Sequence, residues 1–99
     1  MRKSIIQTKQ ICRHPRCMRT QSLHSHEVFY GTANRKKSIE DGMVIYLCGE
    51  HHNLSNEGIH FDKKFDLEEK RNAQTIWEKT YGKKDPRREF IRRYGRSYL

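Results

Sequence analysis

Hydrophobic residues along the chain fall into short runs and helical stripes that predict its elements. Residues 43–47 (Met-Val-Ile-Tyr-Leu) are a short apolar run rich in β-branched and aromatic side chains, which is the clearest strand signal in the sequence. Residues 23–30 alternate weakly and predict a second strand, which Gly31 ends. The polar, basic stretch 32–42 is predicted to be a loop with one helical turn around Ser38, and residues 48–56 to begin a short helix.

Two longer helices are expected after a loop over residues 56–65. Asp66 is predicted to cap the first, because Glu69 stands three residues later as in a capping box, and Gly82 to end it. Its apolar stripe is Ala73, Ile76 and Trp77. The second helix is expected to begin at Asp85-Pro86, where proline suits the first helical position, and to end before Gly95. Its apolar face is Phe90, Ile91 and Tyr94.

The length and composition then limit the architecture. A chain of 99 residues has room for one domain, and with 33% hydrophobic residues and a mean hydropathy of −1.09 its core is small. We expect an N-terminal arm over 1–11 and a single domain over 12–99, with a core over about 12–60 and helices over about 66–95. The expected fold class is α+β. A core this small predicts an additional staple, either disulfides or a structural metal.

The cysteines favour the metal. There are three, so disulfides cannot pair them all. No apolar run approaches ~18 residues, so a membrane span is not expected. No secretion signal is visible either, so we expect the protein to be located in a reducing cytoplasm. In that compartment, cysteine and histidine pairs are more typical of metal sites than of disulfides.

Two half-sites predict a structural zinc ion. Cys12 and Cys17 form a Cys-x4-Cys turn, and Cys48 and His51 form a Cys-x2-His pair. Each pair is close enough in sequence for one turn to aim both side chains at one tetrahedral ion, and the gap between the pairs lets the ion join distant segments. His14 or His52 remains an alternative to His51 as the fourth ligand.

The other histidines predict a catalytic group. His24 and His26 face the same way on a strand, and His52 diverges from its neighbour His51 by ~100° on a helix. Phosphodiester hydrolysis needs a base, a divalent metal and stabilisation of the leaving oxygen. His26 can serve as the base at neutral pH. His52 is the expected metal ligand, with Glu27, His24 or Asn34 nearby.

The net charge of +9 and the pI near 9.7 favour a polyanionic partner, of which nucleic acid is the first candidate. Arginine and lysine side chains of this kind bind phosphates largely without reading sequence. The expected DNA-binding residues are Arg35, Lys36, Lys37, Arg92 and Arg93, with further arginines at 13, 16 and 19 and at 87, 88 and 96.

The order of these motifs resembles the HNH (ββα-metal) endonucleases. The phrases that carry the likeness are His26-Glu27-Val28-Phe29-Tyr30-Gly31, Asn34-Arg35-Lys36-Lys37-Ser38, Cys48-Gly49-Glu50-His51-His52 and Gly58-Ile59-His60-Phe61. They look closest to small phage and prophage HNH-like proteins, which include the recombination-enhancement, RecA-dependent nucleases.

The resemblance implies site residues and cofactors. It makes His26 the general base, Asn34 the residue that orients it, and His52 a ligand of a catalytic Mg²⁺ or Mn²⁺, with His60 able to reach that metal. The chain departs from the family by having Ser25-His26-Glu27 on the strand. If His26 takes the first of the family's two positions, it is a metal ligand and Glu27 is the base.

The sequence is therefore compatible with three functions. The first is a metal-dependent DNA endonuclease or nickase linked to recombination or DNA processing, with a recombinase filament or another phage protein as a partner. The second is a non-catalytic, zinc-stapled DNA-binding accessory protein. The third is a protein-binding regulator on the same scaffold, which an absence of nucleic-acid binding would favour.

Overall fold

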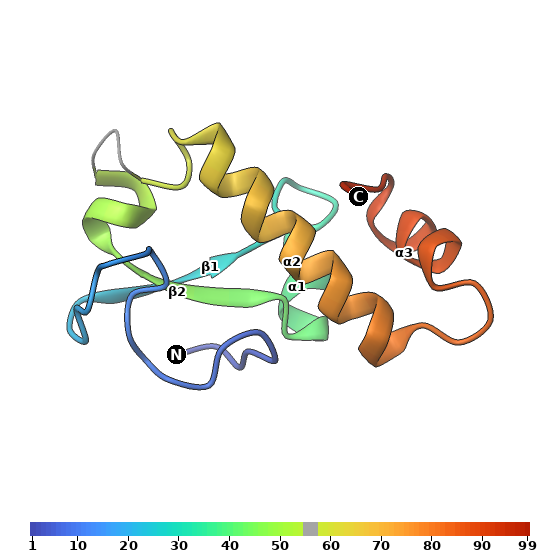
Figure 1. The fold of residues 1–99 in the computed structure, drawn as a ribbon, viewed down its shortest axis with the longest axis horizontal. Helices are drawn as coiled ribbons and strands as arrows, with labels where there is room; N and C mark the ends of the chain where they lie inside the picture. The colour runs from blue at the N-terminus through green and yellow to red at the C-terminus, as the bar shows by residue number, and fades with distance from the viewer. Residues whose placement is uncertain (55–57) are drawn as a thin grey trace.

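The computed structural model describes residues 1–54 and 58–99, and it shows the expected α+β architecture (Figure 1). Its elements in chain order are β1 (Leu23–Glu27), α1 (Arg35–Asp41), β2 (Val44–Cys48), the π-helix η1 (Glu50–Leu54), α2 (Lys63–Tyr81) and α3 (Pro86–Tyr94). Within the described residues, no helix is both long enough and apolar enough to cross a membrane.

The two strands form an antiparallel pair that α2 crosses on one face (Figure 1). The register places Leu23 opposite Cys48 and Glu27 opposite Val44. β2 lies within one residue of its prediction, and each of its five residues is buried. β1 ends earlier than predicted, because the chain turns away after Val28 toward α1.

The N-terminal segment, which was expected to be an arm, covers the outer edge of β2. The Ser4 hydroxyl donates to the carbonyl of Val44, and the side-chain oxygen of Gln7 accepts a hydrogen bond from the backbone N–H of Tyr46 at 2.8 Å. Unpaired strand edges are prone to pair with other chains. These two side chains therefore occupy edge positions that another strand would otherwise fill.

The stretch between the strands is more helical than predicted. α1 has seven residues rather than a single turn, and it ends at Gly42, whose φ of 73° gives the left-handed cap that favours glycine. Ser38 is buried, and its hydroxyl accepts from the backbone N–H of Phe29 and donates to the carbonyl of Phe29 at 2.6 Å. This paired contact fixes α1 against the end of β1.

The predicted cap of α2 was wrong by one turn. Asp62, not Asp66, is the N-cap, and its side chain accepts from the backbone N–H of Phe65 at 3.1 Å. The earlier start lets Phe65 join the core, which a start at Asp66 would leave in a loop. Asp66 instead lies in the first turn and binds Lys70 at 2.7 Å.

α3 follows its prediction. Asp85 caps it by accepting from the backbone N–H of Arg88 at 3.3 Å, and Pro86 is its first residue. Phe90 is buried against Trp77 with ring centroids 5.5 Å apart. Ile91, expected on the apolar face, is 40% exposed and does not belong to it.

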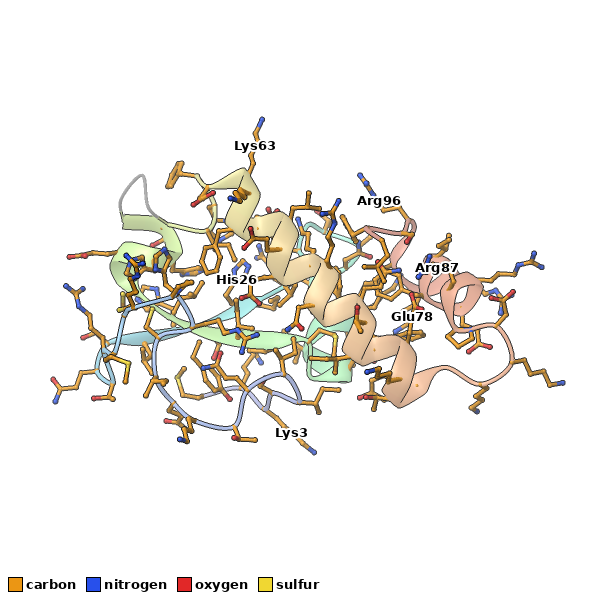
Figure 2. The ribbon with its side chains drawn as sticks, viewed as in Figure 1. Lys3, His26, Lys63, Glu78, Arg87 and Arg96 are labelled. Carbon is orange, nitrogen blue, oxygen red and sulfur yellow. The ribbon has the colours of Figure 1, made fainter. Side chains whose placement is uncertain are left out.

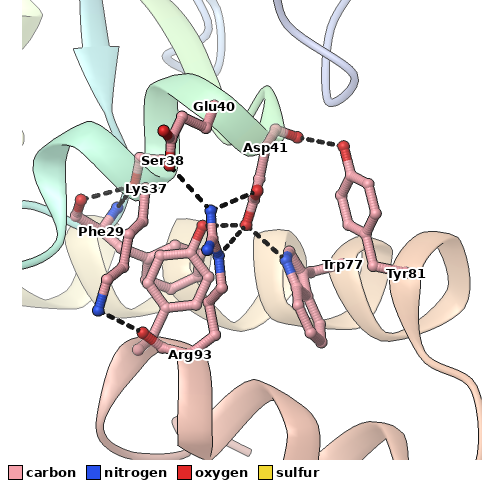
Figure 3. Close-up of polar contacts among 9 residues, drawn as sticks. Phe29, Lys37, Ser38, Glu40, Asp41, Trp77, Tyr81 and Arg93 are labelled. Carbon is pink, nitrogen blue, oxygen red and sulfur yellow. Dashed lines mark hydrogen bonds and ion pairs between the residues drawn. The ribbon is translucent and has the colours of Figure 1, made fainter.

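A carboxylate, Asp41, joins the three α-helices (Figure 3). Its Oδ2 accepts from Trp77 Nε1 on α2 at 2.8 Å and from the Tyr94 hydroxyl on α3 at 2.7 Å. Arg93 adds two charge-assisted hydrogen bonds, each of 2.9 Å. The Tyr81 hydroxyl donates to the Asp41 backbone carbonyl at 2.8 Å. Burial and this carboxylate both raise the pKa of Tyr94, so its hydroxyl stays a donor.

We expect Asp41→Ala to lower the free energy of unfolding by about 2–4 kcal/mol, because it leaves buried donors and the Arg93 charge without their acceptor. Urea denaturation of the zinc-loaded protein measures the loss. The matched control is Glu40→Ala, which removes only a solvent-exposed ion pair with Arg93 and should cost less than about 1 kcal/mol. Equal losses for the two variants would contradict the role given to Asp41.

Candidate functional site

Four metal-binding side chains from distant segments meet beside the hairpin. They are Cys12 and Cys17 from the N-terminal turn, Cys48 at the end of β2 and His51 in η1, and their ligand atoms all lie within 4.8 Å of one another. Two groups of potential metal ligands occur among the described residues, and this is the one that contains cysteine. It unites the two half-sites expected from the sequence.

The N-terminal turn is shaped by its own backbone. The N–H of Cys17 donates to the carbonyl of His14 at 3.1 Å, and the N–H of Cys12 donates to the carbonyl of Arg19 at 2.8 Å. Arg16 at the tip has a φ of 68°, in the left-handed region that a non-glycine residue adopts only when its surroundings require it. The turn thus directs both thiols to one point.

The separations fit a tetrahedral zinc ion. With Zn–S near ~2.3 Å and Zn–N near ~2.0 Å, ligand sulfurs should be about 3.8 Å apart and a sulfur and a nitrogen about 3.5 Å apart. Cys17 Sγ and Cys48 Sγ are 3.9 Å apart, and His51 Nδ1 is 3.2 Å from Cys48 Sγ and 3.5 Å from Cys12 Sγ. This group can therefore hold a metal such as zinc.

The thiols differ in acidity. Burial raises the pKa of Cys12 to about 11. Burial also acts to raise the pKa of Cys48, but the backbone N–H of His51, the neighbouring thiols and the charge of Arg19 together lower it below its ordinary value. Zinc binds thiolates, and Cys48 is the thiol that these surroundings favour in the thiolate form.

The structure also separates the candidates for the fourth zinc ligand. His51 lies with the three cysteines in the group that could hold the ion. His14 instead stacks on the His51 ring with centroids 3.9 Å apart and donates from Nδ1 to the carbonyl of Pro15. His52 turns away from the cysteines into a second group. The adjacent histidines therefore face different centres, as their angular separation on a helix predicts.

The second group consists of His26, His52 and His60, whose ligand nitrogens lie within 4.8 Å of one another. His26 comes from β1 and is labelled in Figure 2. His52 Nε2 is 3.2 Å from His60 Nε2, and His52 Nδ1 is 2.9 Å from His24 Nδ1. Three imidazoles that converge in this way can hold a divalent ion.

His26 is the most deeply buried member of this group. The residue is only 2% exposed, and its Nε2 is buried without a hydrogen-bond partner among the described residues. Burial and the charges of His52 and His60 lower the pKa of His26 to about 3. Burial, His60 and His24 lower the pKa of His52 to about 4. Both rings are therefore neutral at pH 7, which is the form that binds metals and accepts protons.

The other expected site residues lie elsewhere. Glu27 follows His26 on β1, so its side chain leaves from the opposite face, and it pairs with Arg35 at 3.8 Å. Asn34 precedes α1, and its side-chain N–H donates to the carbonyl of Tyr94 at 3.1 Å, so its amide holds α3. Within the described chain, no hydrogen bond joins Asn34 to the histidines.

The expected DNA-binding residues divide into two sets. Lys37 donates to the carbonyl of Arg93, and Arg93 is held by Asp41, so both are engaged within the fold. The solvent-exposed members are Arg35, Lys36 and Arg92.

Sequence reasoning missed three residues beside the histidines. The Tyr30 ring lies 5.6 Å from the His26 ring and 5.3 Å from the His60 ring. Lys70 Nζ lies over the ring of this tyrosine, 4.2 Å from its centroid, and is held by Asp66. The i,i+4 spacing of Asp66 and Lys70 was visible in the sequence, but their position depends on how α2 crosses the hairpin.

We expect Cys48→Ala to abolish zinc binding and the cooperative unfolding transition, because zinc binding can contribute ~10–16 kcal/mol to a fold with a small core. Metal analysis and thermal denaturation measure both effects. His14→Ala should keep one zinc ion per chain, since His14 only stacks on a ligand. A folded, zinc-free Cys48→Ala protein would contradict the assignment.

We also expect His26 to stay neutral far below the ordinary histidine range, with its midpoint near pH 3 rather than ~6.5. Imidazole ¹⁵N shifts of zinc-loaded protein, recorded from pH 8 to pH 5 without added Mg²⁺ or Mn²⁺, should show no titration of this ring. A midpoint above pH 6 would show that His26 is exposed to water.

In the comparisons with known proteins, no protein-family model, no curated protein and no solved structure matches this chain.

Proposed function

We propose that the protein is a metal-dependent DNA nuclease of the HNH (ββα-metal) type that hydrolyses phosphodiester bonds. The observation that carries this proposal is the group of His26, His52 and His60, which lies directly beside the cysteine-rich group. The cysteine-rich group is suited to a structural ion. The histidine group has nitrogen ligands and an exposed member, His60, so it is suited to an ion that substrate can reach. The resemblance of the ordered motifs to HNH nucleases supports the same conclusion.

The roles of the histidines follow from their surroundings. His52 and His60 would hold the divalent ion, which when bound would neutralise charge on the phosphate. Because all of these ligands are imidazoles, the set suits Mn²⁺ better than Mg²⁺, which prefers oxygen. His26 is the base: its neutral ring accepts a proton from the attacking water, and the negative charge of a bound phosphate raises its pKa toward the working range.

A ligand role for His26 would leave the site without a base. Glu27, the alternative base, leaves β1 on the other face and pairs with Arg35. Two observations support the base role: the buried Nε2 of His26 has no hydrogen-bond partner among the described residues, and one of its ring nitrogens lies within 4.8 Å of the ligand nitrogens of His52 and His60.

The surface near the site fits a polyanion. A hollow of about 550 Å³ is lined by Gly31, Thr32, Arg35, Lys36 and Ile39. Arg35 is 62% exposed and is close enough to His26 for its charge to lower the pKa of that ring. We propose that DNA passes along this hollow with phosphates on Arg35, Lys36 and the exposed Arg92, in contacts that weaken with salt.

The second candidate is a DNA-binding accessory protein without catalysis, acting with a recombinase filament or another phage protein. The low pKa of His26 in the free protein favours it, since a weak base is a poor activator of water. The two candidates differ in whether the histidine group must hold a metal for function.

The test is a plasmid-nicking assay of zinc-loaded protein with Mn²⁺, with Mg²⁺ and with EDTA. We expect metal-dependent nicking, faster with Mn²⁺, that His26→Ala lowers by about 10²–10⁴-fold, the usual contribution of a general base. His26→Ala should keep its DNA affinity, zinc content and Mn²⁺ binding.

Two controls make the outcome decisive. His14→Ala retains both metal groups and should cut normally. A gel shift without nicking on supercoiled or single-stranded DNA would favour the accessory protein, and loss of Mn²⁺ binding by His26→Ala would make His26 a ligand instead of the base.

A further inference from the structure

The roles proposed so far assign no residue to stabilise the leaving oxygen of the hydrolysis. His26 takes the proton of the water, and His52 and His60 hold the ion, but the leaving oxygen also requires a positive charge or a proton donor. Lys70 on α2 is a cation beside this site. Its charge acts on His26, and its Nζ lies 4.2 Å from the centroid of Tyr30, whose ring contacts His26 and His60.

The Lys70 ammonium is held in place rather than free in solvent. Its side chain is 13% exposed, and Asp66 Oδ2 accepts one hydrogen bond from it at 2.7 Å. Burial lowers the pKa of Lys70, but Asp66 and Tyr30 outweigh this effect and raise it above its ordinary value, so the group stays charged. An ammonium has three donors. Among the described residues, Asp66 and Tyr30 account for two of them, and the third has only the face of the Tyr98 ring nearby, 5.5 Å from Nζ to the centroid, which leaves it available for a ligand.

The polar atoms around Tyr30 are incompletely satisfied. Among the described residues, two buried side-chain atoms have no hydrogen-bond partner, His26 Nε2 and Asp66 Oδ1. His26 packs against the Tyr30 ring, and Asp66 acts on the Tyr30 hydroxyl. Unsatisfied buried polar atoms are rare in folded proteins. His26 Nε2 is thus open to take a proton from a water molecule, whereas the acceptor Asp66 Oδ1 calls for a donor such as water and not for the phosphate itself.

We propose that Lys70 contacts the scissile phosphodiester and stabilises its leaving oxygen. This inference rests on the proposed nuclease function. As the water oxygen bonds to phosphorus and its proton passes to His26, the bond to the leaving oxygen breaks and the electron pair stays on that oxygen. The Lys70 ammonium donates a hydrogen bond to it, and the oxygen then takes a proton from solvent water. Asp66 and Tyr30 are positioning residues for the ammonium.

The test compares Lys70→Met, which keeps the length of the side chain, with Lys70→Arg and the control Lys63→Met. Lys63 projects from the start of the same helix into solvent (Figure 2). We expect Lys70→Met to lower kcat by about 10²-fold with KM changed less than threefold, as for loss of one transition-state donor. Lys70→Arg should recover part of the rate, and Lys63→Met should match the wild type.

A substrate with sulfur in place of the leaving oxygen separates a chemical role from a structural one. Sulfur leaves as a stable thiolate and needs little help, so Lys70→Met should cut this substrate within about fivefold of the wild-type rate. An equal loss on both substrates, or a normal rate on the oxygen substrate, would overturn the inference while the wild type still cuts. If the wild type cuts neither substrate, the nuclease proposal fails and this inference fails with it.

A binding measurement gives a second readout that does not depend on cleavage. The ¹⁵Nζ signal of Lys70 in zinc-loaded protein should shift on titration with inorganic phosphate, and the signal of Lys63 should move much less. Zinc content and melting temperature of each variant show that the fold is retained. Equal shifts for the two lysines, or none for Lys70, would exclude a phosphate contact at this position.

Discussion

The structure depends on one constraint, the meeting of Cys12, Cys17, Cys48 and His51 at a point that a metal ion can occupy. A chain with so few hydrophobic residues cannot rely on burial alone, and this group joins the N-terminal turn to the end of β2 and the start of η1. The rest of the fold is arranged around that junction: α2 covers the hairpin, and the Asp41 carboxylate fastens α1 and α3 to α2.

The same junction positions the candidate chemistry. His51 is fixed toward the cysteines, so its neighbour His52 must face the other way, where β1 presents His26 and the following loop presents His60. The position of the cysteine-containing group thus also sets the direction of His52 in the histidine group, because His51 and His52 are consecutive residues. Nearby, α2 brings Lys70 against Tyr30, so that a cation lies one aromatic ring away from the histidines.

The sequence was most informative where the partners are close along the chain. The half-site spacings, the β2 run and the Asp85-Pro86 start of α3 are local patterns, and the structure has them where they were expected. It was least informative where the choice depends on distant contacts. Asp62 and Asp66 are chemically equal as caps, and burial of Phe65 decides between them. The partner of Asn34 is Tyr94, 60 positions away, and no local pattern encodes that contact.

The division of the two adjacent histidines between two centres is the central claim, and X-ray absorption at the zinc and manganese edges tests it most directly. Protein loaded with one zinc ion and then with Mn²⁺ should give a zinc spectrum with three sulfurs at ~2.3 Å and one nitrogen at ~2.0 Å, and a manganese spectrum with nitrogen and oxygen neighbours only. A manganese shell containing sulfur, or a zinc shell without it, would contradict the account.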